Sequence, residues 1–321
     1  MESGAMSALE VVVFPPLESA GFGVFWTVMG LFVGSFLNVC IHRFPVEGAS
    51  VWSPSRSHCP GCDRMLGWRE NLPVLSWLLQ RGRCLGCAAP IHWRYPLVEL
   101  IGAGAFHLVW RAAASQGWEF LLLDSVVLSG LIVATFVDFE RYEIPDQVSI
   151  GGMWAAPIVS FLLPSLHGEG AVALAMASGG TVDGVASLSE SLVGMALGGG
   201  VLLAIGWVGK KASGSEAMGF GDVKLMAAGG GLIGAGGVFQ ALQVAVFSGA
   251  LIGVLNILRW YLVVRARQRR RRLQHRGAPQ ALRTARVLGR YLPFGPYLAL
   301  GIGIVLLDWK DVLDLLPFGL G

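Results

Sequence analysis

Long apolar runs alternate with short polar segments along most of the chain. A membrane-spanning helix needs about 20 mostly apolar residues, and eight runs approach that length. They cover residues 22–41, 96–112, 119–137, 147–164, 190–208, 223–239, 240–264 and 293–310. The sixth and seventh runs are joined by GGGLIGAGG (229–237), which predicts a glycine-rich hinge and no polar loop. The pattern therefore predicts an all-α polytopic membrane protein with about eight transmembrane helices.

The same pattern divides the chain into segments. We expect an outer N-terminal segment over 1–21, a first transmembrane helix over 22–41, a cytoplasmic lobe over 42–95, and a larger transmembrane domain over 96–321. The first apolar run should remain as an anchor, because the residues before it include Glu2 and Glu10 and no basic n-region of a signal peptide.

Composition supports a membrane protein. Hydrophobic residues make up 54% of the chain and charged residues only 14%, whereas a soluble domain carries about 25% charged residues. The 45 glycines also fit this class, since small residues let membrane helices approach closely.

Basic residues fall on one side of the predicted eight-span weave. Lys and Arg gather in four segments, 42–95, 138–146, 209–222 and 265–290, while the opposite side is mainly acidic. Because positive loops remain in the cytoplasm, these segments are predicted to be cytoplasmic and both termini periplasmic.

The segment 265–290 is a polybasic loop that begins with RARQRRRRLQHR. We expect it to lie on anionic lipid of the cytoplasmic leaflet; the alternative is a solvated positive-inside anchor. Nucleic-acid binding is disfavoured, since no base-reading or stacking module accompanies the run.

Four cysteines form two CxxC knuckles within the predicted lobe. Cys59 and Cys62 belong to CPGC, and Cys84 and Cys87 belong to CLGC, with 21 residues between the knuckles. Four thiolates in this pattern favour a structural, tetrahedral Zn²⁺ site, although the spacing slightly exceeds the usual range of about 15–20 residues. Redox-active or metal-free thiols are the alternative. His58 and His92 are possible substitute ligands.

Ionisable residues at membrane depth are costly and are usually functional. Glu99 lies within the second predicted span, Asp138 ends the third, and Asp222 begins the sixth. Asp138 and Asp222 both lie where a span meets the cytoplasmic face, so they are expected at the same depth. Two aspartates held together can share a proton, activate water and polarise a peptide carbonyl. That is the chemistry of an aspartic protease.

The neighbours of Asp222 fit a peptide site. Gly219 and Gly221 would let the backbone turn sharply and an extended peptide approach, and Lys224 either tunes Asp222 or snorkels to the membrane surface. The alternative interpretation is that Asp222 caps a helix while Asp138 pairs with Lys224 or Arg141. Asp146 follows Pro145 in the first turn of a helix, so a structural role is favoured.

With these motifs, the chain resembles the type IV prepilin leader peptidases, bifunctional GxGD aspartic membrane proteases of pilus and type II secretion systems. The motifs that carry the resemblance run in the family's order over most of the chain. They are GLFVGSFLNVCIHRFP (30–45), the paired knuckles, WRENLPVLSWLLQRGRC (68–84), RYPLVEL (94–100), DFERYEIPD (138–146), GFGDVKL (219–225) and PFGPYLALG (293–301).

The resemblance implies two reactions at the cytoplasmic face of the bacterial inner membrane. Asp138 and Asp222 correspond to the catalytic aspartates that cut a short basic leader from prepilins and pseudopilins, a step that needs no cofactor. The new N-terminus is then methylated with S-adenosylmethionine, and the zinc lobe is associated with this step. Glu70, the acid of WRENLP, is a candidate for binding the substrate amine, with a surface ion pair as the alternative. The S-adenosylmethionine site has no recognisable signature.

Three other functions remain open. A GxGD protease of the presenilin or preflagellin kind would lack the cysteine knuckles. A transporter would place Asp138, Asp222 and Glu99 along a path across the bilayer. A member restricted to cleavage would have lost methylation.

Overall fold

The computed structural model describes residues 16–53, 57–167, 183–214, 218–270 and 293–308. Most of the predicted outer segment 1–21, most of the polybasic loop 265–290 and both termini lie outside these residues, so their predicted positions stay predictions. The long helices are α1 (Ala20–Arg43), α3 (Arg94–Ala113), α4 (Trp118–Arg141), α5 (Asp146–Leu162), α7 (Gly184–Ser213), α8 (Phe220–Arg270) and α10 (Gly295–Leu306). The short ones are η1 (Trp68–Asn71), α2 (Leu75–Leu79) and η2 (Pro164–His167).

The predicted all-α fold is confirmed for these residues, in which the only β structure consists of isolated bridges. Every predicted apolar run contains a helix, and α8 contains both the sixth and the seventh. Four helices, α1, α4, α7 and α8, are long and apolar enough to cross a membrane. The count of eight spans is therefore not confirmed: α5 has 17 residues, α10 has 12, and α3 carries three charged residues.

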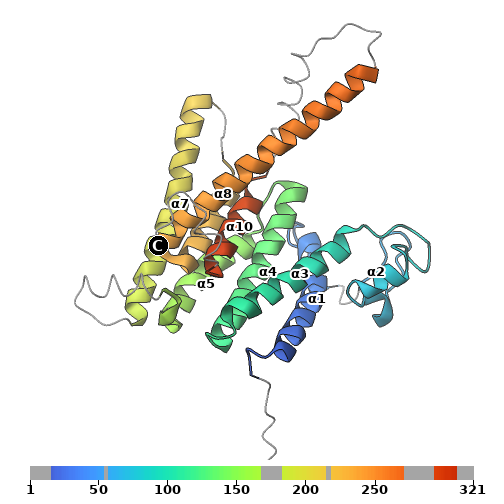
Figure 1. Cartoon of the computed structure of the whole chain (residues 1–321), viewed down its shortest axis with the longest axis horizontal. Coiled ribbons are helices and arrows are strands. Elements are labelled where there is room, and N and C mark those ends of the chain that lie inside the picture. Colours follow the sequence, from blue (N-terminus) through green and yellow to red (C-terminus); the bar gives the residue numbers. More distant parts are fainter. Residues whose placement is uncertain (1–15, 54–56, 168–182, 215–217, 271–292, 309–321) are drawn as a thin grey trace, which may run out of the picture.

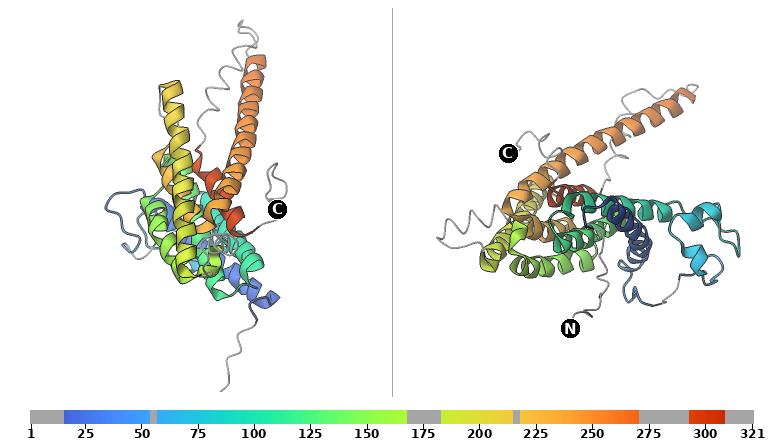
Figure 2. Two further views of the ribbon diagram at one scale, coloured as in Figure 1. Left: turned by 90° about the vertical axis from the view of Figure 1, so that its left-hand side faces the viewer. Right: turned by 60° about the horizontal axis from the view of Figure 1, so that its bottom comes forward.

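Two groups of helices form the body of the molecule. In Figure 1, α1, α3 and α4 lie together beside the small lobe that contains α2, and α5, α7 and α8 lie on the other side. Both views of Figure 2 agree with this arrangement. α10 packs against both α4 and α8 and so joins the groups. The largest core lies at this junction and includes Leu131, Leu202, Met226, Leu298 and Ile302.

Small residues allow the helices to approach closely. A Cβ atom added at Gly30 of α1 would lie 2.6 Å from the Gly102 carbonyl oxygen of α3. Between α7 and α8, a Cβ atom at Gly194 would clash with the carbonyl of Gly230. Close backbone approach is a common way for helices to associate in a membrane. Lipid tails are as apolar as the helix surfaces, so no hydrophobic driving force brings the helices together there. The many glycines of the sequence are thus used in packing.

α8 folds back on itself at Gly234, inside the predicted hinge and before the predicted boundary between the sixth and seventh runs. Gly234 has φ 71° and ψ 177°, a conformation essentially restricted to glycine. The N–H of Ala235 donates to Glu190 Oε1 of α7 at 2.8 Å, and His167 Nδ1 lies 3.0 Å from the Ser187 hydroxyl at the same end. The first part of α8 packs along α7 and also contacts α10, and the part after Gly234 packs along α10.

The fold-back predicts a specific sensitivity. Replacing Gly234 with alanine should lower the free energy of unfolding by about 1–3 kcal/mol, because the added Cβ would lie 3.0 Å from Glu190 Oε1 in a backbone region that alanine avoids. Thermal unfolding of the purified protein in detergent measures this loss. Gly236→Ala is the matched control, since Gly236 is helical with open space around it. Equal stability of the two variants would contradict the prediction.

Candidate active site and candidate metal centre

Asp138 lies in the last turn of α4 and is almost fully buried, with 5% of its surface exposed. The helix ends because Tyr142 adopts a left-handed conformation (φ 57°), from which its N–H donates to the Asp138 carbonyl. The Asp138 side chain faces α10, where the N–H of Gly295 donates to Oδ2 at 3.0 Å. A Cβ atom at position 295 would lie 2.5 Å from this oxygen, so only glycine fits there.

Asp222 lies in the first turn of α8 and lines the same cleft as Asp138. This cleft has a volume of about 580 Å³. The structure thus brings the two predicted catalytic aspartates together.

The structure does not show the sharp turn that was predicted at the glycines beside Asp222. Neither Gly219 nor Gly221 has a positive φ. A Cβ atom at Gly221 would lie 3.2 Å from the Ile144 Cβ atom, so this glycine lets α8 approach the α4–α5 turn. Gly219 lines the cleft, and a Cβ atom there would lie 3.4 Å from Asp222 Oδ2. The absence of a side chain at these two glycines therefore lets other groups approach closely beside the carboxylates.

Lys224 forms an ion pair with Asp146 of α5, and its ammonium lies 5.7 Å from the centre of the Phe220 ring. The alternative in which Asp138 pairs with Lys224 or Arg141 is not seen in the described residues. Lys224 thus joins the starts of α5 and α8, and Asp146 has the structural contact that its place in the first helical turn indicated.

The four cysteines of the lobe form one cluster. All four Sγ atoms lie within 4.8 Å of one another, and the cluster does not include His58 or His92. The Sγ atoms of Cys59 and Cys87 are 3.7 Å apart, close to the separation of about 3.8 Å expected for two thiolates at a Zn–S distance of 2.3 Å. The cluster therefore fits a tetrahedral metal ion.

Backbone donors support the thiolate form that metal binding requires. The N–H groups of Gly61 and Gly86 donate to the sulfurs of Cys59 and Cys84, each at 3.4 Å. Hydrogen bonds from the backbone of Cys87 and of Gly86 lower the pKa of Cys84 to about 6. The glycine within each knuckle thus turns a donor toward a sulfur.

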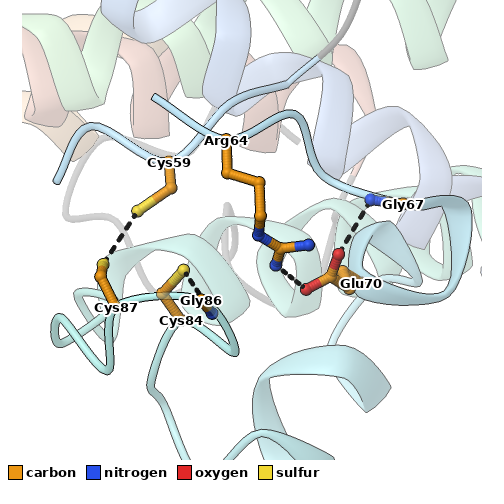
Figure 3. Close-up of polar contacts among 7 residues, drawn as sticks. All are labelled: Cys59, Arg64, Gly67, Glu70, Cys84, Gly86 and Cys87. Atoms are coloured by element: carbon orange, nitrogen blue, oxygen red, sulfur yellow. Dashed lines mark hydrogen bonds and ion pairs between the residues drawn. The ribbon is translucent and has the colours of Figure 1, made fainter. Parts of the chain in front are cut away.

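Glu70, in η1, is held by two partners on the same lobe. Arg64 donates to its Oε1 at 2.5 Å, and the N–H of Gly67 donates to its Oε2 at 2.9 Å. Figure 3 shows the Arg64 side chain between Glu70 and the cysteine cluster. The hydrogen bond from the Arg64 side chain, and to a smaller extent the one from the Gly67 N–H, holds the pKa of Glu70 below its usual value. The geometry is that of the alternative interpretation, an acid paired with an arginine.

Glu99 anchors the lobe to the membrane helices. Its Oε2 accepts the N–H of Val74 at 2.7 Å, although Val74 must adopt φ 61° to reach it. A second link joins Arg94, at the start of α3, to Glu140, at the end of α4. Glu99 is not among the residues that line the cleft of Asp138 and Asp222, so the described acids do not form the path that a transporter would need.

Sequence reasoning missed Gly295 and Asp124. Gly295 stands in the PFGPYLALG motif, whose role was not apparent before its contact with Asp138. Asp124 is 3% exposed in α4, and an acid inside the apolar run WEFLLLDSVVLSG was the signal that would have found it.

Comparison with known proteins gives the relatives of the chain. A model of the bacterial peptidase A24 N-terminal domain matches residues 28–112, and a model of the type IV leader peptidase family matches residues 125–254. A prepilin leader peptidase/N-methyltransferase of Aeromonas hydrophila is 32% identical over 307 residues, covering 88% of this chain and 89% of that protein. The chain belongs to the type IV leader peptidase family.

Other members of the type IV leader peptidase family match over similar lengths. Proteins of the same description from Stutzerimonas stutzeri and Myxococcus xanthus are 31% and 36% identical. The first match covers 95% of this chain and 96% of that protein, and the second covers 74% and 64%. No solved structure matches the chain. The family and the apolar helices together establish a multi-pass membrane protein.

The Arg64–Glu70 pair predicts a pH dependence of the lobe. Because the folded-state pKa of Glu70 lies below its usual value near 4.5, the pair stabilises the lobe above that pH. This stabilisation is lost as the pH falls through 4.5 and below. Tryptophan fluorescence between pH 7 and pH 3 should therefore show an acid transition that is weaker in Glu70→Gln. The difference between the two proteins isolates Glu70 from the cysteines, and identical curves would refute the prediction.

Proposed function

We propose that this protein cleaves the leader from type IV prepilins and type II secretion pseudopilins and then N-methylates the new N-terminal residue. The observation that carries the peptidase step is the single cleft lined by Asp138 and Asp222. The names of the relatives, prepilin leader peptidase/N-methyltransferase, support both steps.

The two aspartates supply the chemistry of peptide hydrolysis. Two close carboxylates favour a state in which they share one proton. The ionised one takes a proton from water as that water attacks the peptide carbon, and the protonated one donates to the carbonyl oxygen. The C–N bond of the resulting adduct then breaks as the carboxyl that took the water proton passes it to the departing nitrogen. The N–H of Gly295 holds Oδ2 of Asp138 in place during this step. No side-chain nucleophile is needed.

In the methylation step, S-adenosylmethionine supplies the methyl group to the α-amine freed by cleavage. We assign this step to the lobe over 42–95, and we keep Glu70 as a candidate for orienting the amine, although its two oxygens already have partners. Zn²⁺ held by Cys59, Cys62, Cys84 and Cys87 would fix the fold of the lobe. With all four positions filled by protein ligands, this ion is structural.

We place the protein in the bacterial inner membrane with the cleft at the cytoplasmic face. The support is the asymmetry of Lys and Arg along the sequence. A presenilin-like or preflagellin peptidase is disfavoured, because the model of the bacterial N-terminal domain matches the region that holds the cysteine cluster.

Removing either aspartate tests the peptidase mechanism. We expect Asp138→Asn and Asp222→Asn each to lower the kcat for prepilin cleavage by about 10²–10⁴-fold, the usual contribution of a general acid or base. Gel-shift assays with purified enzyme and prepilin measure the rate. Glu119→Gln, an exposed acid at the other end of α4, should cleave normally. Cleavage at the normal rate by either Asn variant would rule out the two-aspartate mechanism.

Removing the metal tests the role of the lobe. We expect Cys84→Ser to lower the bound zinc, measured by elemental analysis, from one ion per chain. Because the lobe then loses its cross-link, transfer of labelled methyl groups should fall more than cleavage does. Cys40→Ser is the control, since Cys40 packs between helices and lies outside the cluster. Unchanged zinc content in Cys84→Ser would exclude the four-cysteine site, and unchanged methylation without zinc would separate the lobe from that step.

A further inference from the structure

The rim of the catalytic cleft is built from three segments that are distant in the sequence. They are residues 44–49 after α1, residues 142–147 between α4 and α5, and residues 219–224 at the start of α8. The first contributes Glu47 and the second Glu143, and both side chains are exposed. The cleft thus leads from two solvent-accessible acids to the nearly buried carboxylate of Asp138.

The charges that line this cleft are unbalanced. Its acids are Glu47, Asp138, Glu143, Asp146 and Asp222, and its only cation among the described residues is Lys224. Lys224 is paired with Asp146. No ion pair of the described residues involves Glu47 or Glu143, so no basic side chain of that part of the chain neutralises these two acids.

Other charged residues near the cleft already have partners. Glu140 stands close by in the sequence but is paired with Arg94. Arg43, the basic residue nearest to Glu47 in the sequence, donates to the carbonyls of Ser50 and Val51. The surroundings therefore single out Glu47 and Glu143 within a chain whose net charge is +3. A concave site of this charge favours a positively charged peptide segment.

The position of the two acids indicates which part of a substrate they contact. In the proposed function the apolar helix of the substrate stays in the membrane, whereas Glu47 and Glu143 belong to loops beyond the ends of α1 and α4. We propose that Glu47 and Glu143 bind Lys or Arg side chains of the segment that precedes the scissile bond, and thereby set the requirement for a basic leader. This inference rests on the proposed peptidase function and assigns specificity to two residues outside the catalytic pair.

The expected effect is on substrate binding. Exposed ion pairs are individually weak and are screened by salt, so each Glu→Gln change should raise KM by about two- to fivefold and leave kcat nearly unchanged. The double variant Glu47→Lys/Glu143→Lys adds repulsion and should raise KM by about tenfold or more. Its KM should also lack the rise with salt that we expect of the wild-type enzyme.

A charge exchange makes the test specific. The full-length enzyme is assayed with three prepilins: the basic-leader form, one in which the leader Lys and Arg are Gln, and one in which they are Glu. The double Lys variant should cleave the Gln form with the wild-type kcat, which shows that it is folded. It should prefer the Glu form over the basic form, the reverse of the wild-type order. Glu119→Lys, at an exposed acid of α4 outside the cleft, is the matched control and should keep the wild-type order.

The outcomes separate the two proposals. A wild-type enzyme that cleaves none of the prepilins overturns the proposed function. A wild-type enzyme that cleaves the basic form, with a double Lys variant of equal KM and unchanged preference, overturns only the role of Glu47 and Glu143. Binding of a labelled basic leader peptide to the Asp222→Asn protein tests the contact without turnover. If the leader peptide binds with equal affinity whether or not Glu47 and Glu143 are also replaced, the proposed role of these two residues is overturned.

Discussion

The reversal of α8 at Gly234 is the constraint on which the site depends. It lets the segment after Gly234 pack along α10, which the part before Gly234 also contacts, so that Asp222 and much of the surface that holds α10 come from the same helix. α10 in turn presents the N–H of Gly295 to Asp138. A straight α8 would remove the contacts between the residues after Gly234 and α10. The backbone conformation at one glycine thus helps to hold the helix that donates to Asp138.

The lobe is attached at two points that approach the catalytic cleft from different sides. Glu99 holds the backbone of Val74 against α3, and Arg94 pairs with Glu140, two positions after Asp138. The loop from α1 into the lobe also forms part of the cleft wall through residues 44–49. The segment that leads from α1 into the lobe therefore belongs both to the cleft and to the region in which we propose methylation.

Local patterns predicted the parts of this structure that local chemistry determines. The glycine cluster at 229–237 contains the reversal of α8. The spacing of the CxxC knuckles predicted a four-sulfur cluster, and the four cysteines do lie together. The count of spans was less secure, because α5 is short and α8 merges two runs. The placement of Asp138 and Asp222 in one cleft followed from the charge asymmetry of the loops together with the family motifs.

The contacts that complete the site join distant segments and had no local signal. Asp138 and Gly295 are 157 positions apart, and Lys224 and Asp146 are 78 positions apart. The sequence placed Lys224 beside Asp222, against Asp138 or at the membrane surface, and did not indicate Asp146 as its partner. Glu47 was one acid among many, because the sequence does not show that the loop after α1 borders the cleft.

The contact between Gly295 and Asp138 also has a consequence for biosynthesis. Since α10 is the last described helix, a nascent chain can carry both aspartates into the membrane long before the donor that orients Asp138 has been synthesised. In the proposed mechanism, the growing polypeptide lacks a finished hydrolytic centre until α10 has been made, while its earlier helices insert among other newly made membrane proteins. Synthesis of α10 would then act as a safeguard against premature proteolysis.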